Sequence, residues 1–178
     1  MEERWKRAET TGILDVSDMK LQSLPDLPET ITHLYCHHNF LTSLPDLPPT
    51  LKELNCMHNR LEALPDLPAA LETLTCSYNN LQTLSDLSEN LTILDCSHTP
   101  LRELPALPSK LVILRAEHAK LTVLPQMPAS LIELWCEENP WTTNFGAFFK
   151  NEKSQYGRMQ AVRKYYSKFG TASLQGFA

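Results

Sequence analysis

The histidines are the side chains of this sequence that most readily bind metals or exchange protons near neutral pH. Four of them recur every 20 residues, and a tyrosine takes the intervening place in the same column: His38, His58, Tyr78, His98 and His118. Neighbouring strands of a parallel sheet would place these rings about 5 Å apart. We interpret the column as a solvated row without bound metal, which becomes charged below pH ~6.5. A zinc or nickel site involving His37, His38 and His58 is the alternative.

All five cysteines form a second column with the same spacing: Cys36, Cys56, Cys76, Cys96 and Cys136, with Ala116 in the remaining place. An alanine in this column indicates a small buried position, so we expect reduced thiols in the core. Disulfides between adjacent strands are disfavoured, because side chains in register on parallel strands do not readily meet the required geometry. Zinc ligands must converge on one point, whereas these residues would lie along a line. The column therefore indicates a reducing compartment.

Asp95, Ser97 and His98 are the residue types of a hydrolytic triad. Residues this close on one strand point to fixed, alternating faces, so they do not readily form a chain of nucleophile, base and orienting acid. The sequence contains neither a glycine-rich phosphate loop nor a strand–turn–helix nucleophile elbow. We therefore expect a protein that is not an enzyme and that has no cofactor.

These columns belong to a repeat of 20 residues that runs without insertion from Leu21 to Pro140. The second half of each unit, such as Leu54-Asn55-Cys56, alternates apolar and variable residues and predicts a half-buried strand. The first half, such as residues 44–48, contains prolines that exclude a helix and favour an extended chain. Strands that return every 20 residues must pair in parallel, with the leucines packed between the two halves. One unit cannot bury its leucines alone, so stability comes from stacking.

The chain divides into three predicted parts. Residues 1–20 form an N-terminal cap, with a short helix over residues 2–9, and a first half repeat. Residues 21–140 form six full repeats. Residues 141–178 form a basic cap with a helix over residues 155–169. Caps are expected because a solenoid must shield the core at its two ends.

Composition restricts the function further. The chain has 178 residues, a net charge of −5 and 42% hydrophobic residues, as in ordinary folded proteins. No apolar run approaches the roughly 20 residues of a membrane span, and the N-terminus lacks the apolar segment of a secretory signal. The acidic total argues against nucleic-acid binding. Residues 150–178 carry six basic residues and one acidic residue, which we interpret as a solvated face; contact with a membrane or an acidic partner is the alternative.

The segment from Leu71 to Leu81, which reads L-x-x-L-x-C-x-x-N-x-L, resembles the leucine-rich-repeat signature. The period with its L-P-x-L-P motif resembles the short class found in secreted bacterial effectors, and cysteine within the strand is similar to proteins of giant viruses and some bacteria. The resemblance implies an α/β leucine-rich-repeat solenoid with one curved parallel sheet, an extended, polyproline-like convex side and helical caps. It also implies that the asparagine column bonds successive turns; Thr99 and Ala119 interrupt that column.

The remaining candidate for function is the concave face of the sheet. Its predicted outward columns include five side chains of the kinds that anchor protein interfaces: Tyr35, Ile93, Ile113, Arg115 and Trp135. We expect a non-catalytic protein–protein interaction module in a reducing cytoplasm, with no nucleic-acid ligand and no stable membrane insertion. The resemblance implies a host-directed effector, acting in the host cytoplasm, or a viral protein. A structural virion or capsid-associated component, held by its tail and outer wall, is the alternative.

Overall fold

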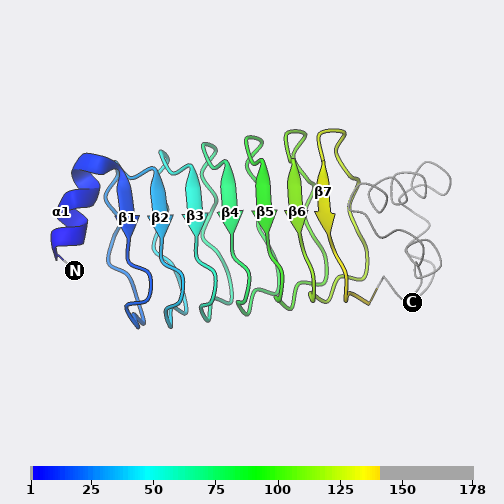
Figure 1. The fold of residues 1–178 in the computed structure, drawn as a ribbon, viewed down its shortest axis with the longest axis horizontal. Coiled ribbons are helices and arrows are strands. Elements are labelled where there is room, and N and C mark those ends of the chain that lie inside the picture. Colours follow the sequence, from blue (N-terminus) through cyan, green and yellow to red (C-terminus); the bar gives the residue numbers. More distant parts are fainter. Residues whose placement is uncertain (1, 141–178) are drawn as a thin grey trace.

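The chain forms a row of short parallel strands that stack in sequence order, beginning beside a helix (Figure 1). The computed structural model describes residues 2–140, so the predicted cap over residues 141–178, with its helix over residues 155–169, lies outside the described residues. The described elements are α1 (Glu2–Thr11), β1 (Ile13–Asp15), β2 (His33–Tyr35), β3 (Glu53–Asn55), β4 (Thr73–Thr75), β5 (Ile93–Asp95), β6 (Ile113–Arg115) and β7 (Glu133–Trp135). They confirm the predicted parallel sheet, which has seven strands within the described residues.

Each strand pairs with the residues that lie 20 positions further along the chain, as Leu14 with Leu34 and Leu34 with Leu54. The central leucine of every strand is buried, and the residues on either side of it are partly or fully exposed. This is the alternation that the sequence predicts for a half-buried strand. The side chains of the strands therefore divide into one face toward the core and one face away from it.

The core is a stack of leucine layers. Leu51, Leu54, Leu71 and Leu74 have no exposed surface, and the corresponding leucines of the other turns are similarly enclosed. Burying a leucine side chain fully contributes about 1.5–3 kcal/mol, and here each leucine needs the next turn to cover it. The segments with prolines contain neither helix nor strand, so they form the extended wall opposite the sheet.

Helix α1 covers the first strand and confirms the predicted N-terminal helix, which extends two residues beyond its expected end. Ala8 is completely buried, and Trp5 packs against the core. The helix ends at Thr11 and is followed by Gly12, whose φ of +71° is the left-handed conformation that commonly follows a helix. The Gly12 carbonyl accepts hydrogen bonds from the amides of Thr32 and His33, at 2.7 and 3.0 Å. The cap is thereby bonded to the second turn of the solenoid.

None of the helices within residues 2–140 has the length and apolar character needed to cross a bilayer. The five cysteines are free thiols in the core, as predicted. Burial raises the pKa of Cys36 to about 12 and also raises the pKa of Cys96. Since the thiolate is the reactive form of cysteine, these side chains act as small apolar core residues.

Candidate interaction surface

We use the term exposed sheet face for the surface opposite the leucine core. It has three columns: the first residue of each strand, the third residue of each strand, and the residue two positions after that third residue. The third column is only partly exposed: the alternation of the strands would point Ser77 and Ser97 outward, but both are nearly completely buried. Ser97 Oγ accepts a hydrogen bond from the Glu117 amide at 3.3 Å, so this short side chain lies against the next turn.

Four of the five predicted anchors lie together on β5, β6 and β7. Ile93 and Ile113 are paired residues on adjacent strands, and both are partly exposed. Arg115 is the neighbour of Trp135 in the next strand, and its Nη2 lies 3.7 Å from Glu133 Oε2. Trp135 Nε1 is buried and has no hydrogen-bond partner within residues 2–140. The sheet thus places two apolar side chains beside a guanidinium and an indole.

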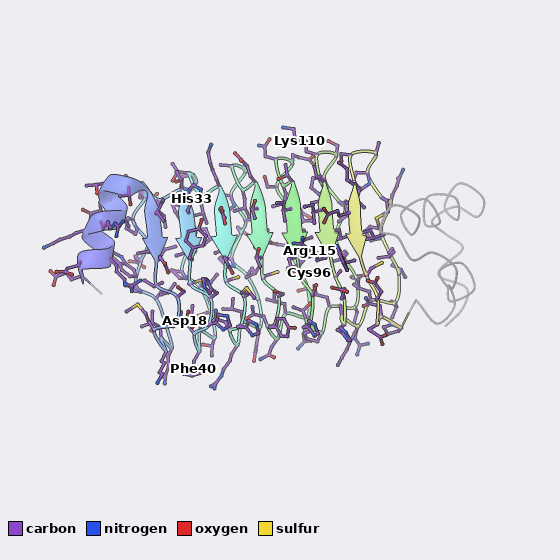
Figure 2. The ribbon with its side chains drawn as sticks, viewed as in Figure 1. Asp18, His33, Phe40, Cys96, Lys110 and Arg115 are labelled. Atoms are coloured by element: carbon purple, nitrogen blue, oxygen red, sulfur yellow. The ribbon has the colours of Figure 1, made fainter. Side chains whose placement is uncertain are left out.

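The fifth predicted anchor, Tyr35, is separate from this group because it lies on β2. Three strand spacings, about 14 Å, separate β2 from β5. In Figure 2, His33, which is on β2 like Tyr35, lies well away from Arg115 on β6. The rings of Tyr35 and His33 are 6.4 Å apart, and burial, followed by the nearby Glu53 carboxylate, raises the pKa of Tyr35. The structure therefore does not combine the five residues into one continuous patch.

The two halves of the exposed sheet face differ in charge. On the turns of β1, β2 and β3 the two carboxylates each face a basic side chain: Asp15 lies 4.0 Å from Arg4, and Glu53 lies 3.8 Å from His33. On the turns of β5, β6 and β7, this face carries four carboxylates and a single arginine: Asp95, Glu117, Glu133, Glu137 and Arg115. Sequence reasoning missed this asymmetry, although the predicted columns contain every one of these residues.

The histidine column forms a continuous stack of rings at the edge where the strands end. Successive ring centroids are 4.4, 4.2, 4.2 and 4.5 Å apart from His38 to His118. Each of these residues has a positive φ of 50–55°, a conformation in which histidine is enriched among non-glycine residues. Figure 2 shows Asp18 and Phe40 at this same edge and Lys110 at the opposite one. The spacing confirms the predicted separation of about 5 Å.

The stacked geometry does not suit the alternative of a zinc or nickel site. Nearly parallel rings, 14° apart for His38 and His58, direct their nitrogen lone pairs side by side instead of toward one point. Within residues 2–140 no group of three or more histidine, cysteine or acidic residues is arranged to hold a metal ion. Partial burial and the neighbouring imidazoles, His38 first, lower the pKa of His58. Partial burial followed by His118 likewise lowers the pKa of His98.

Asp95, Ser97 and His98 are not arranged as a triad. Asp95 Oδ1 accepts the Ser97 backbone amide at 3.1 Å. The His98 ring stacks between the rings of Tyr78 and His118, with centroids 4.2 and 4.5 Å away. Each residue is therefore engaged locally, and the described contacts do not link a hydroxyl nucleophile to a base.

The asparagine column bonds successive turns, as expected. Asn79 Oδ1 accepts a hydrogen bond from the Leu61 amide at 3.0 Å. Asn79 Nδ2 donates hydrogen bonds to the carbonyls of Cys56 and Cys76, also at 3.0 Å. Asn39, Asn59 and Asn139 make corresponding bonds. Thr99, in contrast, donates only to the Cys96 carbonyl of its own turn, at 2.6 Å, and Ala119 has no polar side-chain atom.

Three features together define a leucine-rich-repeat solenoid of the short class. They are the leucine core, the parallel sheet with turns of 20 residues, and the column of asparagines that bond successive turns, which we call the asparagine ladder. Solved structures show which proteins share this fold. The Shigella effector leucine-rich-repeat domain has a TM-score of 0.74 and 38% identity, over 78% of this chain and 64% of that chain. YopM from Yersinia enterocolitica WA-314 has a TM-score of 0.67 and 37% identity, over 67% of this chain and 27% of that chain.

YopM from Yersinia pestis, a leucine-rich effector protein, has a TM-score of 0.72 and 33% identity over 79% of this chain and 41% of that chain. The chain therefore resembles bacterial effector proteins with leucine-rich repeats but spans less than two thirds of each of these neighbours. No protein-family model matches the sequence, and the comparison with curated proteins found no match.

Proposed function

We propose that the chain is a non-catalytic protein–protein interaction module whose exposed sheet face, the concave face of a leucine-rich-repeat solenoid, binds a protein partner. The observation that carries this proposal is the group of four adjacent side chains on β5, β6 and β7: Ile93, Ile113, Arg115 and Trp135. Arginine and tryptophan are typical of interface anchors, and a rigid sheet presents them at little entropic cost. Tyr35 is a second, separate contact point.

The likeness to bacterial effectors supports a role directed at a host protein. The five free thiols support action in a reducing compartment, such as the host cytoplasm. The alternative of a virion component gains no support from these neighbours. Solenoids present an extended concave surface, which favours binding over catalysis.

Site-specific photo-crosslinking tests the proposal. A benzophenone side chain replaces Ile113 on the exposed sheet face, and a matched protein carries it at Ile132, which is 62% exposed but lies outside the exposed sheet face. In host-cell lysate, we expect the probe at position 113 to crosslink a discrete protein that the probe at position 132 does not. Equal crosslinking from both positions would contradict binding through the exposed sheet face.

A variant with Tyr35→Ala, Arg115→Ala and Trp135→Ala then tests the anchors themselves. The matched control replaces an aromatic, a basic and an aliphatic residue elsewhere: Phe40→Ala, Arg102→Ala and Ile132→Ala. We expect capture of the crosslinked partner to be lost with the first variant and kept with the second. Circular dichroism of both proteins verifies that the solenoid is folded.

A further inference from the structure

The β5–β7 half of the exposed sheet face combines an apolar floor with an excess of negative charge. The apolar floor consists of Ile93 and Ile113, which lie side by side in register as the first residues of β5 and β6. Each of these three turns also carries at least one carboxylate on this face: Asp95, Glu117, Glu133 and Glu137. The single guanidinium, Arg115, is already ion-paired with Glu133. A partner that covers the isoleucines must therefore approach several carboxylates at once.

Within residues 2–140, the Asp95 and Glu117 carboxylates form no ion pair with a lysine or an arginine, whereas Glu133 is paired with Arg115. The Asp95 carboxylate accepts a hydrogen bond from the Ser97 amide, and this bond leaves the negative charge of Asp95 in place. Apart from Arg115, no lysine or arginine occupies the exposed sheet face of these turns. On the turns of β1–β3, in contrast, the two carboxylates on this face have basic neighbours: Asp15 lies 4.0 Å from Arg4, and Glu53 lies 3.8 Å from His33, which is charged only when protonated. The excess of negative charge is therefore larger on the β5–β7 half of the exposed sheet face.

The turn of β4 separates the two halves with small, uncharged side chains: Thr73, Thr75 and Ser77. A partner bound over β5–β7 is thus bordered on one side by a low, neutral strip. Across an interface, complementary charge favours the correct partner and speeds association, whereas like charge costs several kcal/mol. A phosphate-rich or acidic ligand would be repelled from the floor that the two isoleucines provide.

We infer that the β5–β7 half of the exposed sheet face binds a positively charged protein segment, in which lysine or arginine side chains flank an apolar residue that packs on Ile93 and Ile113. This inference rests on the proposed function and specifies the chemistry of its partner. The basic side chains pair with the carboxylates of Asp95 and Glu117, and the apolar residue covers the floor.

A peptide selection tests the inference. The full chain is immobilised and used to select 12-residue peptides from a random library displayed on phage. We expect the enriched peptides to carry a net positive charge and at least one large apolar residue. Their binding should weaken with added salt, because exposed charge pairs are screened. Enrichment of neutral or acidic peptides, or of none, would overturn the inference.

Matched variants locate the contact. Asp95→Asn with Glu117→Gln removes two charges at the floor, and Glu89→Gln with Glu103→Gln removes two charges from exposed positions on the opposite wall. We expect the first variant to bind the selected basic peptides about fivefold more weakly, as for a few partly exposed charge pairs. The second variant should bind them unchanged. Equal effects of the two variants would contradict a charged contact at this half of the face.

One further variant separates failure of this inference from failure of the proposed function. The selected peptides could lack a positive charge and yet fail to bind the variant with Ile93→Ala and Ile113→Ala. That result would overturn the charge inference but would still support binding through this face. Peptides that bind this variant as well as they bind the unaltered chain would contradict both. A synthetic peptide of residues 150–168 that binds β5–β7 more tightly than the selected peptides would assign the site to the chain's own basic segment instead.

Discussion

The turns that carry β2, β3 and β4 differ from those that carry β5 and β6 in how they are bonded to their neighbours and in what they expose. In the first group each turn has its asparagine, and each asparagine bonds to the preceding turn. In the second group Thr99 and Ala119 take that position, and the bond between turns is missing. The same second group presents Ile93, Ile113 and the unpaired charge of Asp95.

This difference separates the residues that maintain the solenoid from those available for recognition. The leucines and asparagines repeat because each turn must satisfy the same packing and the same buried backbone groups. The exposed sheet face carries no such requirement, so its residues vary from turn to turn. The turns with the weaker ladder carry the richer surface, and stability and binding can be measured separately in the two regions.

The largest expected effect on stability comes from replacing an asparagine of the asparagine ladder. Asn79→Ala removes the bonds to the Leu61 amide and to the Cys56 and Cys76 carbonyls, leaving buried groups unpaired. We expect the free energy of unfolding to fall by about 2–4 kcal/mol, since each unsatisfied buried group costs about 1–3 kcal/mol. Urea denaturation measures the change.

Thr99→Ala is the matched control, because it removes only one hydrogen bond, to the Cys96 carbonyl. Its expected cost is about 1 kcal/mol. If the two substitutions cost the same, the turns of β4 and β5 would not differ in how the ladder stabilises them.

Much of this architecture could be predicted from the sequence because its causes are periodic. The 20-residue spacing predicts strand register, and the leucine and asparagine columns predict the core and the ladder. The grouping of the proposed anchors is harder to predict. Residue type alone suggests Tyr35 together with Ile113 and Trp135, whereas the structure separates β2 from β6 and β7 by several strands. Binding anchors have no period, so their grouping depends on distances between turns.

The burial of Ser77 and Ser97 shows a second limit of sequence reasoning. Alternation predicts that both point outward, but the position lies at the turn after the strand, where regular pleating has ended. Short side chains are covered there by adjacent turns. The stacked histidine column lies one residue further on, where a left-handed backbone aligns the rings. Spacing predicted how far apart these rings lie, but the parallel stacking depends on that backbone conformation.

Restoring the ladder should give a smaller effect of opposite sign. The side chain introduced by Ala119→Asn can accept a hydrogen bond from the Leu101 amide and donate one to the Cys96 carbonyl, by analogy with Asn139 in the next turn. We expect the free energy of unfolding to rise by about 1–2 kcal/mol. Urea denaturation is again the measurement, and Ala106→Asn, at an exposed position on the wall, is the control. An unchanged or lower stability would mean that this turn has packed around the alanine.

The smallest expected effect comes from pH and concerns the ring stack that crosses both regions. In the folded chain the pKa values of His58 and His98 lie below the ordinary value, since partial burial and nearby imidazoles disfavour the charged form. The unfolded chain therefore binds protons more readily. The contribution of these residues to stability is complete above pH ~6.5 and is lost as the pH falls through their lower folded pKa values.

Urea denaturation between pH 8 and about pH 5.5 tests this dependence before the carboxylates begin to protonate. We expect His58→Tyr with His98→Tyr to flatten the pH profile, because tyrosine keeps a flat ring in the stack, as Tyr78 does at 4.2 Å from both neighbours. His33→Gln, outside the stack, should leave the profile steep. Should the double variant retain the full pH dependence, protonation of the stack would not be its cause, and the stack would serve only to pack adjacent turns together.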